Sequence, residues 1–186
     1  NPVIWRNYTD VFDYAPFMRY LLNTLIICSA HLFGTIFTCS LAGYAFARLR
    51  APGRSIVFMV MLGTMMVPWM VTLIPVYILF AELKWINTFR PLMIPALFGS
   101  SFYIFLLRQY YMSLPYELDE AALMDGCSYL GIWWRILMPL TKPVLATVSI
   151  FTFMGAWNDF TGPLIFLNDT HKYTLSLGLT VFQQSR

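Results

Sequence analysis

Residues 114–139 read LPYELDEAALMDGCSYLGIWWRILMP, a polar and turn-rich stretch in a sequence that is 59% hydrophobic and 11% charged. Its first half favours a short helix, because the positive end of a helix dipole stabilises the carboxylates of Glu117, Asp119 and Glu120. Gly126 has no Cβ and is suited to end that helix in the left-handed region. The first half therefore predicts a helix that stops at Gly126.

A second helical segment is predicted after the glycine, because Ser128 can cap its start and Pro139 limits its length. The first helix places Leu118, Ala121 and Ala122 near one face, at three- and four-residue spacing. Small alanines beside charged residues would let the backbone of a partner come close. The local chemistry alone also fits a solvated loop with some helical content.

Long apolar runs surround this stretch, and crossing a bilayer core takes about 20 such residues. Four spans are predicted, at 20–47, 55–81, 91–111 and 144–167. They leave an external loop at 1–19, a loop at 112–143 and an external loop at 168–186. Pro68 and Pro75 interrupt the second run and are expected to bend it. The predicted fold class is an all-α, polytopic transmembrane helical bundle.

Charge counting does not settle the orientation of these spans, because the 12 lysines and arginines divide into six on each side of the predicted membrane. Arg48, Arg50 and Arg54 cluster in one tight turn, and such clusters are typical of cytoplasmic turns. This turn lies on the same side as the loop at 112–143. That loop is therefore expected in the cytoplasm.

Composition and motifs exclude several classes of protein. The net charge of +3 is small and scattered, so no nucleic-acid partner is expected. The 3 cysteines form no CxxC or Cys/His cluster, so no disulfide framework or zinc site is predicted. The sequence has no GxxxxGK(S/T), GxGxxG, HExxH or GxSxG motif. We therefore expect a non-catalytic chain that binds no cofactor or metal of its own.

Polar side chains inside the predicted spans are candidates for a solute or ion pathway, because an ionisable group within the membrane is functional by default. His31 lies in the first span, and Trp157, Asn158 and Asp159 lie in the fourth. Sugars are held by aromatic faces and polar side chains, so these last three residues are candidate pathway contacts, with Tyr77 behind them. The alternatives are a neutral histidine bonded to a neighbouring helix, and a helix break whose polar groups bond its own backbone or a partner.

The spacing in the opening stretch resembles the EAA loop of ABC importer permeases, which runs EAA, three residues, Gly, nine residues, Ile, one residue and Leu-Pro. The corresponding residues here are Glu120-Ala121-Ala122, Gly126, Ile136 and Met138-Pro139. Methionine in place of leucine conserves volume. The run PYELDEAALMDG is most similar to the carbohydrate, or maltose-type, branch. Shorter pieces along the chain resemble the same group, namely Leu21–Thr24, Tyr44–Arg48, Ile74–Tyr77, Phe105–Gln109, Trp157–Phe160 and Tyr173–Leu175.

This resemblance implies a type I ABC importer permease fold with six spans, of which the first and last are expected to lie outside the sequence. It also implies that 112–143 is a coupling loop that docks into a cleft of a cytoplasmic ATPase. The implied coupling residues are Glu117, Glu120, Ala121, Ala122, Asp125 and Gly126. Glu120 would make a charged contact, the two alanines would pack closely, and Gly126 would form the bend.

The implied partners are an ABC ATPase dimer that binds the ATP, a second permease subunit and an extracytoplasmic solute-binding protein, assembled in the lipid bilayer of a bacterial inner membrane. The implied solute is a sugar or related polyol. An alternative is a secondary transporter or channel without an ATPase, in which His31 and Asp159 relay protons or ions. That alternative leaves the spacing within 114–139 unexplained. A membrane scaffold without transport is a third reading, against which the proline-broken spans argue.

Overall fold

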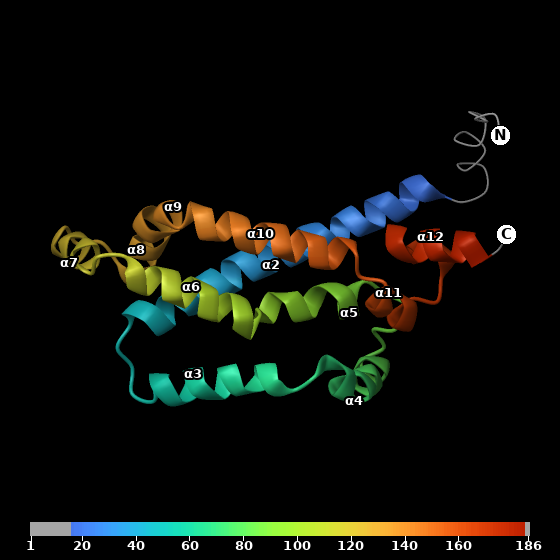
Figure 1. Cartoon of the computed structure of the whole chain (residues 1–186), viewed down its shortest axis with the longest axis horizontal. Coiled ribbons are helices and arrows are strands. Elements are labelled where there is room, and N and C mark those ends of the chain that lie inside the picture. The colour runs from blue at the N-terminus through green and yellow to red at the C-terminus, as the bar shows by residue number, and fades with distance from the viewer. Residues whose placement is uncertain (1–15, 185–186) are drawn as a thin grey trace, which may run out of the picture.

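The computed structural model describes residues 16–184, and within that range it contains helices and connecting segments but no strand. The α-helices are α2 Phe17–Arg48, α3 Arg54–Gly63, α4 Trp69–Glu82, α5 Arg90–Met93, α6 Ser101–Ser113, α7 Glu117–Met124, α8 Tyr129–Ile132, α9 Met138–Leu140, α10 Lys142–Trp157, α11 Thr161–Phe166 and α12 Leu175–Gln184. The 3-10 helices are η1 Thr64–Met66, η2 Ile94–Phe98 and η4 Thr170–Lys172, and η3 Trp133–Leu137 is a π-helix. Figure 1 shows an elongated molecule with α7 at one end and α11 and α12 near the other.

The longest helix, α2, is the axis of the bundle and packs along α6 and α10 (Figure 1). It ends where Leu49 takes an extended backbone. A Cβ added to Gly43 would lie 3.1 Å from the Cβ of Leu107, and one added to Gly34 would lie 3.0 Å from the carbonyl oxygen of Ala96. Small residues on α2 therefore let these segments approach closely.

Two segments are long and apolar enough to cross a bilayer, Phe17–Arg48 and Arg90–Ser113, and they correspond to the first and third predicted spans. The predicted span 55–81 is not one straight helix, because α3 with η1 meets α4 at 98°. The bend falls at Val67, whose extended backbone has φ −84° and ψ 113°. This is the conformation that steric contact with Pro68 favours in the preceding residue.

The predicted span 144–167 also differs from a single helix. α10 ends at Trp157, and α11 follows only after a break. The break is stabilised locally, because Asp159 Oδ1 accepts a hydrogen bond from Gly162 N at 3.1 Å. At its other end, α10 meets the segment Tyr129–Leu140 at 81°. If each bent pair counts as one span, the described residues hold up to 4 candidate spans instead of 2.

Both predicted external loops contain helix. α2 begins within the predicted loop 1–19, of which residues 1–15 lie outside the described residues. The predicted loop 168–186 contains η4 and α12. α12 is helical because it packs on α2, where Leu175 N donates a hydrogen bond to Thr24 Oγ1 at 2.8 Å.

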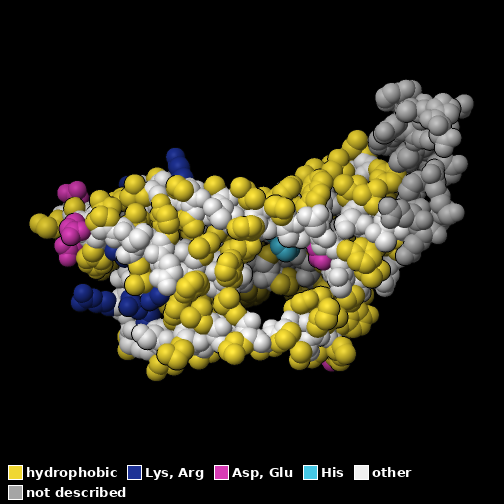
Figure 2. All heavy atoms as spheres, in the orientation of Figure 1, with side chains coloured by type: hydrophobic (Ala, Val, Ile, Leu, Met, Phe, Trp, Pro, Cys, Tyr) yellow, Lys and Arg dark blue, Asp and Glu magenta, His cyan; other side chains and the backbone are white. Residues whose placement is uncertain are grey.

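The core divides into a large cluster near α7 and a smaller cluster near α11. The large core cluster joins α2, α6, η3 and α10 through buried side chains such as Tyr44, Tyr111 and Leu137, and the smaller one joins α2, α4, α5 and α11. The α3–α4 arm, residues 54–82, contributes little, since α3 buries no residue and α4 buries only Phe80. Figure 2 shows a gap between this arm and the rest of the molecule. The exposed apolar side chains of the arm require lipid or another chain as a neighbour.

Candidate functional site

The first helix predicted within residues 114–139 is α7, Glu117–Met124. It ends in a Schellman motif, in which Gly126 N donates to Leu123 O at 3.0 Å and Cys127 N donates to Ala122 O at 2.9 Å. Gly126 has φ +78°, in the region that residues with a side chain rarely adopt. The predicted end of the helix at Gly126 is confirmed.

The part of residues 114–139 that follows Gly126 anchors this stretch in the core. Ser128 caps α8 by accepting a hydrogen bond from Gly131 N at 3.2 Å, as predicted. The chain then passes through η3 and α9, and it places Ile132, Trp133 and Leu137 in the large core cluster at 0%, 4% and 0% exposed. Single π-helical turns are frequent at functional sites. The stretch therefore has a projecting polar half, α7, and an apolar half anchored in the core.

A buried ion pair joins α7 to the end of α2. Arg48 Nε lies 3.5 Å from Asp119 Oδ2, and the two side chains are 6% and 5% exposed. Arg48 Nη2 also donates to Leu114 O at 2.9 Å, and the guanidinium carbon lies 5.4 Å from the centre of the Tyr116 ring. Burial raises the pKa of the Asp119 carboxyl above its ordinary 3.8, and the charge of Arg48 opposes that rise. Arg48 therefore holds both the segment that leads into α7 and the first turn of α7.

Sequence reasoning missed this ion pair. It assigned Arg48 to a cytoplasmic cluster and Asp119 to the helix dipole, and neither assignment requires the two to meet. One signal was available in the spacing, because Asp119 and Ala122 are three residues apart and share a face of α7. An acid on a buried face needs a cation or hydrogen-bond donors.

The predicted coupling residues divide between two faces of α7 and its end. The exposed ones are Glu117, Glu120, Ala121, Asp125 and Gly126. Ala122 is 6% exposed and belongs to the large core cluster. The expectation that Ala121 and Ala122 form one face open to a partner is therefore wrong for Ala122, because that side of α7 packs on its own chain. The surface that remains open combines the carboxylates of Glu117 and Glu120 with apolar side chains such as Leu123 and Met124.

A polar cavity of about 350 Å³ lies between α2, α6 and α10. Its polar lining residues are His31, Thr35, Ser100, Tyr103, Thr152 and Asp159. His31 Nε2 donates a hydrogen bond to the carbonyl oxygen of Leu92. The Thr152 hydroxyl is buried and has no hydrogen-bond partner among the residues that the structure describes. The cavity therefore combines donors and acceptors of the kind that bind hydroxyl groups.

The four predicted pathway residues do not share one site. Asp159 lines the polar cavity together with His31. Trp157 and Asn158 line a separate hollow of about 280 Å³ beside α12. Tyr77 stacks on an aromatic ring of α11, with ring centres 6.2 Å apart. The structure therefore brings together His31 and Asp159 and separates both from the other three.

The hydrogen bonds at the break between α10 and α11 agree with the alternative that Asn158 and Asp159 bond the backbone of their own helix break. Asn158 Nδ2 donates to Met154 O at 2.8 Å, and Asp159 Oδ1 accepts from the backbone N of Gly162 in α11. The missed lining residues on α10 had a signal in the sequence. Thr152, Gly155, Ala156 and Asp159 are spaced i, i+3, i+4 and i+7, which places them on one helical face.

The chemistry available in these sites is hydrogen bonding and charge. Within residues 16–184, no group of three or more His, Cys, Asp or Glu side chains is arranged to hold a metal ion. Cys28, Cys39 and Cys127 are free thiols. The candidate sites are thus a projecting helix held by an ion pair and a polar cavity further along α2.

Curated proteins similar to this chain are permeases. The family described as "Binding-protein-dependent transport system inner membrane component" matches residues 19–185. The arabinooligosaccharides transport system permease protein AraQ of Bacillus subtilis is 34% identical over 175 residues, which are 94% of this chain and 62% of AraQ. The diacetylchitobiose uptake system permease protein NgcG of Streptomyces coelicolor is 30% identical over 189 residues, which are 100% of this chain and 62% of NgcG. The chain therefore spans less than two thirds of the length of these relatives.

A solved structure shares the fold. The crystal structure of a bacterial ABC transporter involved in the import of the acidic polysaccharide alginate contains a chain that matches with a TM-score of 0.81 at 27% identity, over 89% of this chain and 58% of that chain. The fold is thus that of a type I ABC importer permease, and its apolar helices are those of an integral membrane protein. The chain belongs to the family of binding-protein-dependent transport system inner membrane components.

Proposed function

We propose that the full-length protein is the permease subunit of an ABC importer for a sugar or related polyol in a bacterial inner membrane. The family and the relatives named for arabinooligosaccharide and diacetylchitobiose transport support this proposal. In it, the chain catalyses no reaction, and a cytoplasmic ATPase dimer binds and hydrolyses ATP. A second permease subunit completes the pathway, and an extracytoplasmic solute-binding protein delivers the solute.

The observation that carries the coupling role is that α7 exposes carboxylates and apolar side chains on one side and is joined to α2 by a buried ion pair on the other. Glu117 and Glu120 are exposed and suit a basic surface on the ATPase, with Ala121 beside them. On the other side, Asp119 is held by Arg48 at the end of α2. An ATPase that moves α7 therefore moves α2 and the helices packed on it as a body, which is a common way to transmit a conformational change.

The proposed solute contacts are the groups of the polar cavity. The buried Thr152 hydroxyl without a partner and the Asp159 carboxylate would bond sugar hydroxyl groups. Trp157, Asn158 and Tyr77 lie outside this cavity, so we propose them as secondary contacts along the route.

Gly126→Val tests the coupling role, and Gly53→Val is its matched control. Both glycines have positive φ, +78° and +77°, and a Cβ at either meets no atom within 4 Å. Each substitution therefore adds backbone strain of about 1–3 kcal/mol without a clash. In the reconstituted full complex, Gly126→Val should lower solute uptake per ATP hydrolysed, whereas Gly53→Val should leave that ratio unchanged. Equal ratios in the two variants would contradict the coupling role.

A second candidate function is favoured by one observation, that His31 and Asp159 line the same cavity. It is an ATPase-independent transporter in which these two groups relay protons. Uptake by the full-length protein alone, driven by a proton gradient and lost in Asp159→Asn, would support it. Uptake that requires ATP and the ATPase would support the importer.

A further inference from the structure

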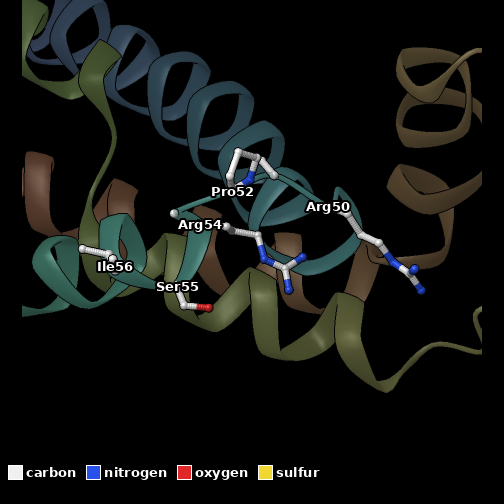
Figure 3. A pocket seen from close by; sticks show the side chains of 7 residues that line it. Arg50, Pro52, Arg54, Ser55 and Ile56 are labelled. Carbon is white, nitrogen blue, oxygen red and sulfur yellow. The ribbon is translucent and has the colours of Figure 1, made fainter.

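Two arginines line a cavity of about 230 Å³ between α2, α3 and α6, which we call the arginine cavity. Arg54 comes from the start of α3 and Arg108 from α6. The other lining residues are Phe46, Ser55, Phe58, Met59 and Leu62. Figure 3 shows the turn that leads into α3, where the guanidinium groups of Arg50 and Arg54 lie apart from each other. Arg50 is not part of the arginine cavity.

Neutral groups hold the two guanidinium groups in place. Arg54 Nη1 donates to Leu49 O at 2.6 Å. Arg108 Nε donates to Phe46 O at 3.2 Å, and its guanidinium carbon lies 4.2 Å from the centre of the Phe58 ring. These contacts orient both cations toward a shared space but bring no negative charge.

The two positive charges lack an anionic partner. No carboxylate of residues 16–184 forms an ion pair with Arg54 or Arg108, whereas Arg48 from the same region pairs with Asp119. Like charges that share a partly apolar cavity repel each other, and an anion between them would remove that repulsion. The planar guanidinium group matches the geometry of phosphate oxygens. The arginine cavity therefore fits a phosphate group.

The exposed side chains of α3 indicate whether the phosphate belongs to a lipid or to a water-soluble anion. α3 buries no residue: Met59, which lines the arginine cavity, is 71% exposed, and Ile56 and Val60, elsewhere on the same helix, are 70% and 66% exposed. Such a surface fits an acyl chain and is unsuited to a water-soluble anion. We propose that Arg54 and Arg108 bind the phosphate of an anionic phospholipid whose acyl chains lie along α3. Basic pockets between helices on the cytoplasmic side bind anionic head groups. Placing this phospholipid in the cytoplasmic leaflet rests on the proposed function; the rest of the proposal does not.

Native mass spectrometry of the full-length transporter in detergent, titrated with phosphatidylglycerol or phosphatidylcholine, tests this proposal. The wild type should retain phosphatidylglycerol in preference to phosphatidylcholine. Arg54→Gln/Arg108→Gln should bind phosphatidylglycerol about 30-fold more weakly, which corresponds to about 1 kcal/mol per arginine. Arg54→Lys/Arg108→Lys keeps both charges but loses the planar donors, so its affinity should lie between those of the wild type and the double glutamine variant. Arg50→Gln is the matched control and should bind as the wild type does.

Equal retention of phosphatidylglycerol by the double glutamine variant, with its subunit composition intact, would overturn the proposal. Equal retention of phosphatidylcholine by the wild type would overturn it as well. Displacement of the lipid by inorganic phosphate would identify a site for a free anion. A cross-link from Arg54→Cys to an acidic segment of the second permease, with no lipid retained, would assign the cavity to a protein partner.

Discussion

The α7 region and the polar cavity lie along the same helix, α2, but they differ in the kind of polar group that they bury. At α7, the buried charges of Arg48 and Asp119 form an ion pair within the chain, although Arg48 Nε and Asp119 Oδ2 make no hydrogen bond among the described residues. In the cavity, the buried Thr152 hydroxyl has no partner among the described residues. An ion pair between two helices holds them together, whereas a hydroxyl without a partner in a cavity suits a ligand with hydroxyl groups. In the proposed function, coupling and solute contact therefore belong to separate parts of α2.

The Arg48–Asp119 ion pair serves position more than stability. The pKa of Asp119 is raised by burial even though the charge of Arg48 opposes the rise, so desolvation outweighs attraction. Buried ion pairs in general add little net stability, but removing one partner leaves an uncompensated buried charge. Removing one partner of the ion pair should therefore have a larger effect than removing a single hydroxyl group from the polar cavity.

The largest expected effect breaks the α7 side of the comparison. Arg48→Met leaves Asp119 buried and without its cation, so the free energy of unfolding should fall by about 3–5 kcal/mol. Arg48→Met/Asp119→Asn removes both charges and should recover most of that loss without restoring solute uptake per ATP. Denaturant unfolding and coupled uptake in liposomes measure the two quantities. A double variant as unstable as Arg48→Met would contradict the ion-pair account.

A smaller effect sharpens the cavity side. Thr152→Val removes a buried hydroxyl that has no partner, so stability should stay the same or rise by up to about 1 kcal/mol. If that hydroxyl bonds the solute, the KM for uptake should rise by about threefold to tenfold, the value of one hydrogen bond. Thr147→Val is the control on the same helix, because the Thr147 hydroxyl already donates to Pro143 O at 3.1 Å. An unchanged KM in Thr152→Val would remove this group from the solute pathway.

The smallest effect is a pH dependence at α7. Because burial raises the pKa of Asp119 above 3.8, the folded state binds this proton more tightly than the unfolded state does. The free energy of unfolding of the wild type, relative to that of Asp119→Asn, should therefore be highest below pH 3.8. This difference should decrease as the pH rises through the raised pKa of Asp119. Unfolding of both proteins from about pH 3 upward measures the difference. A margin that grows with pH would show that attraction to Arg48 dominates.

Features decided within a few residues could be predicted from the sequence. The Schellman end at Gly126, the cap at Ser128 and the bend before Pro68 each depend on backbone preferences of adjacent residues. The family could be predicted as well, because its spacing lies within one stretch. These features needed no knowledge of which segments meet.

Contacts between distant segments could not be predicted in the same way. The ion pair of Arg48 with Asp119 and the burial of Ala122 depend on how α7 packs against α2. The helix α12 forms where a loop was expected, because α2 offers it a surface that includes Thr24. The polar cavity likewise unites groups from α2, α6 and α10, and the spacing along α10 marks one face of that helix but does not show that this face meets His31.

The central claim is that α7 and α2 move as one body. Spin labels at Met124, which is 89% exposed on α7, and at Phe33, which is 69% exposed on α2, allow their distance to be measured in the full transporter with and without ATP. The account predicts that this distance changes by less than about 2 Å in the wild type, the size of an ordinary helix shift, and broadens in Arg48→Met. A larger ATP-dependent change in the wild type would mean that α7 moves independently of α2 and would contradict the account.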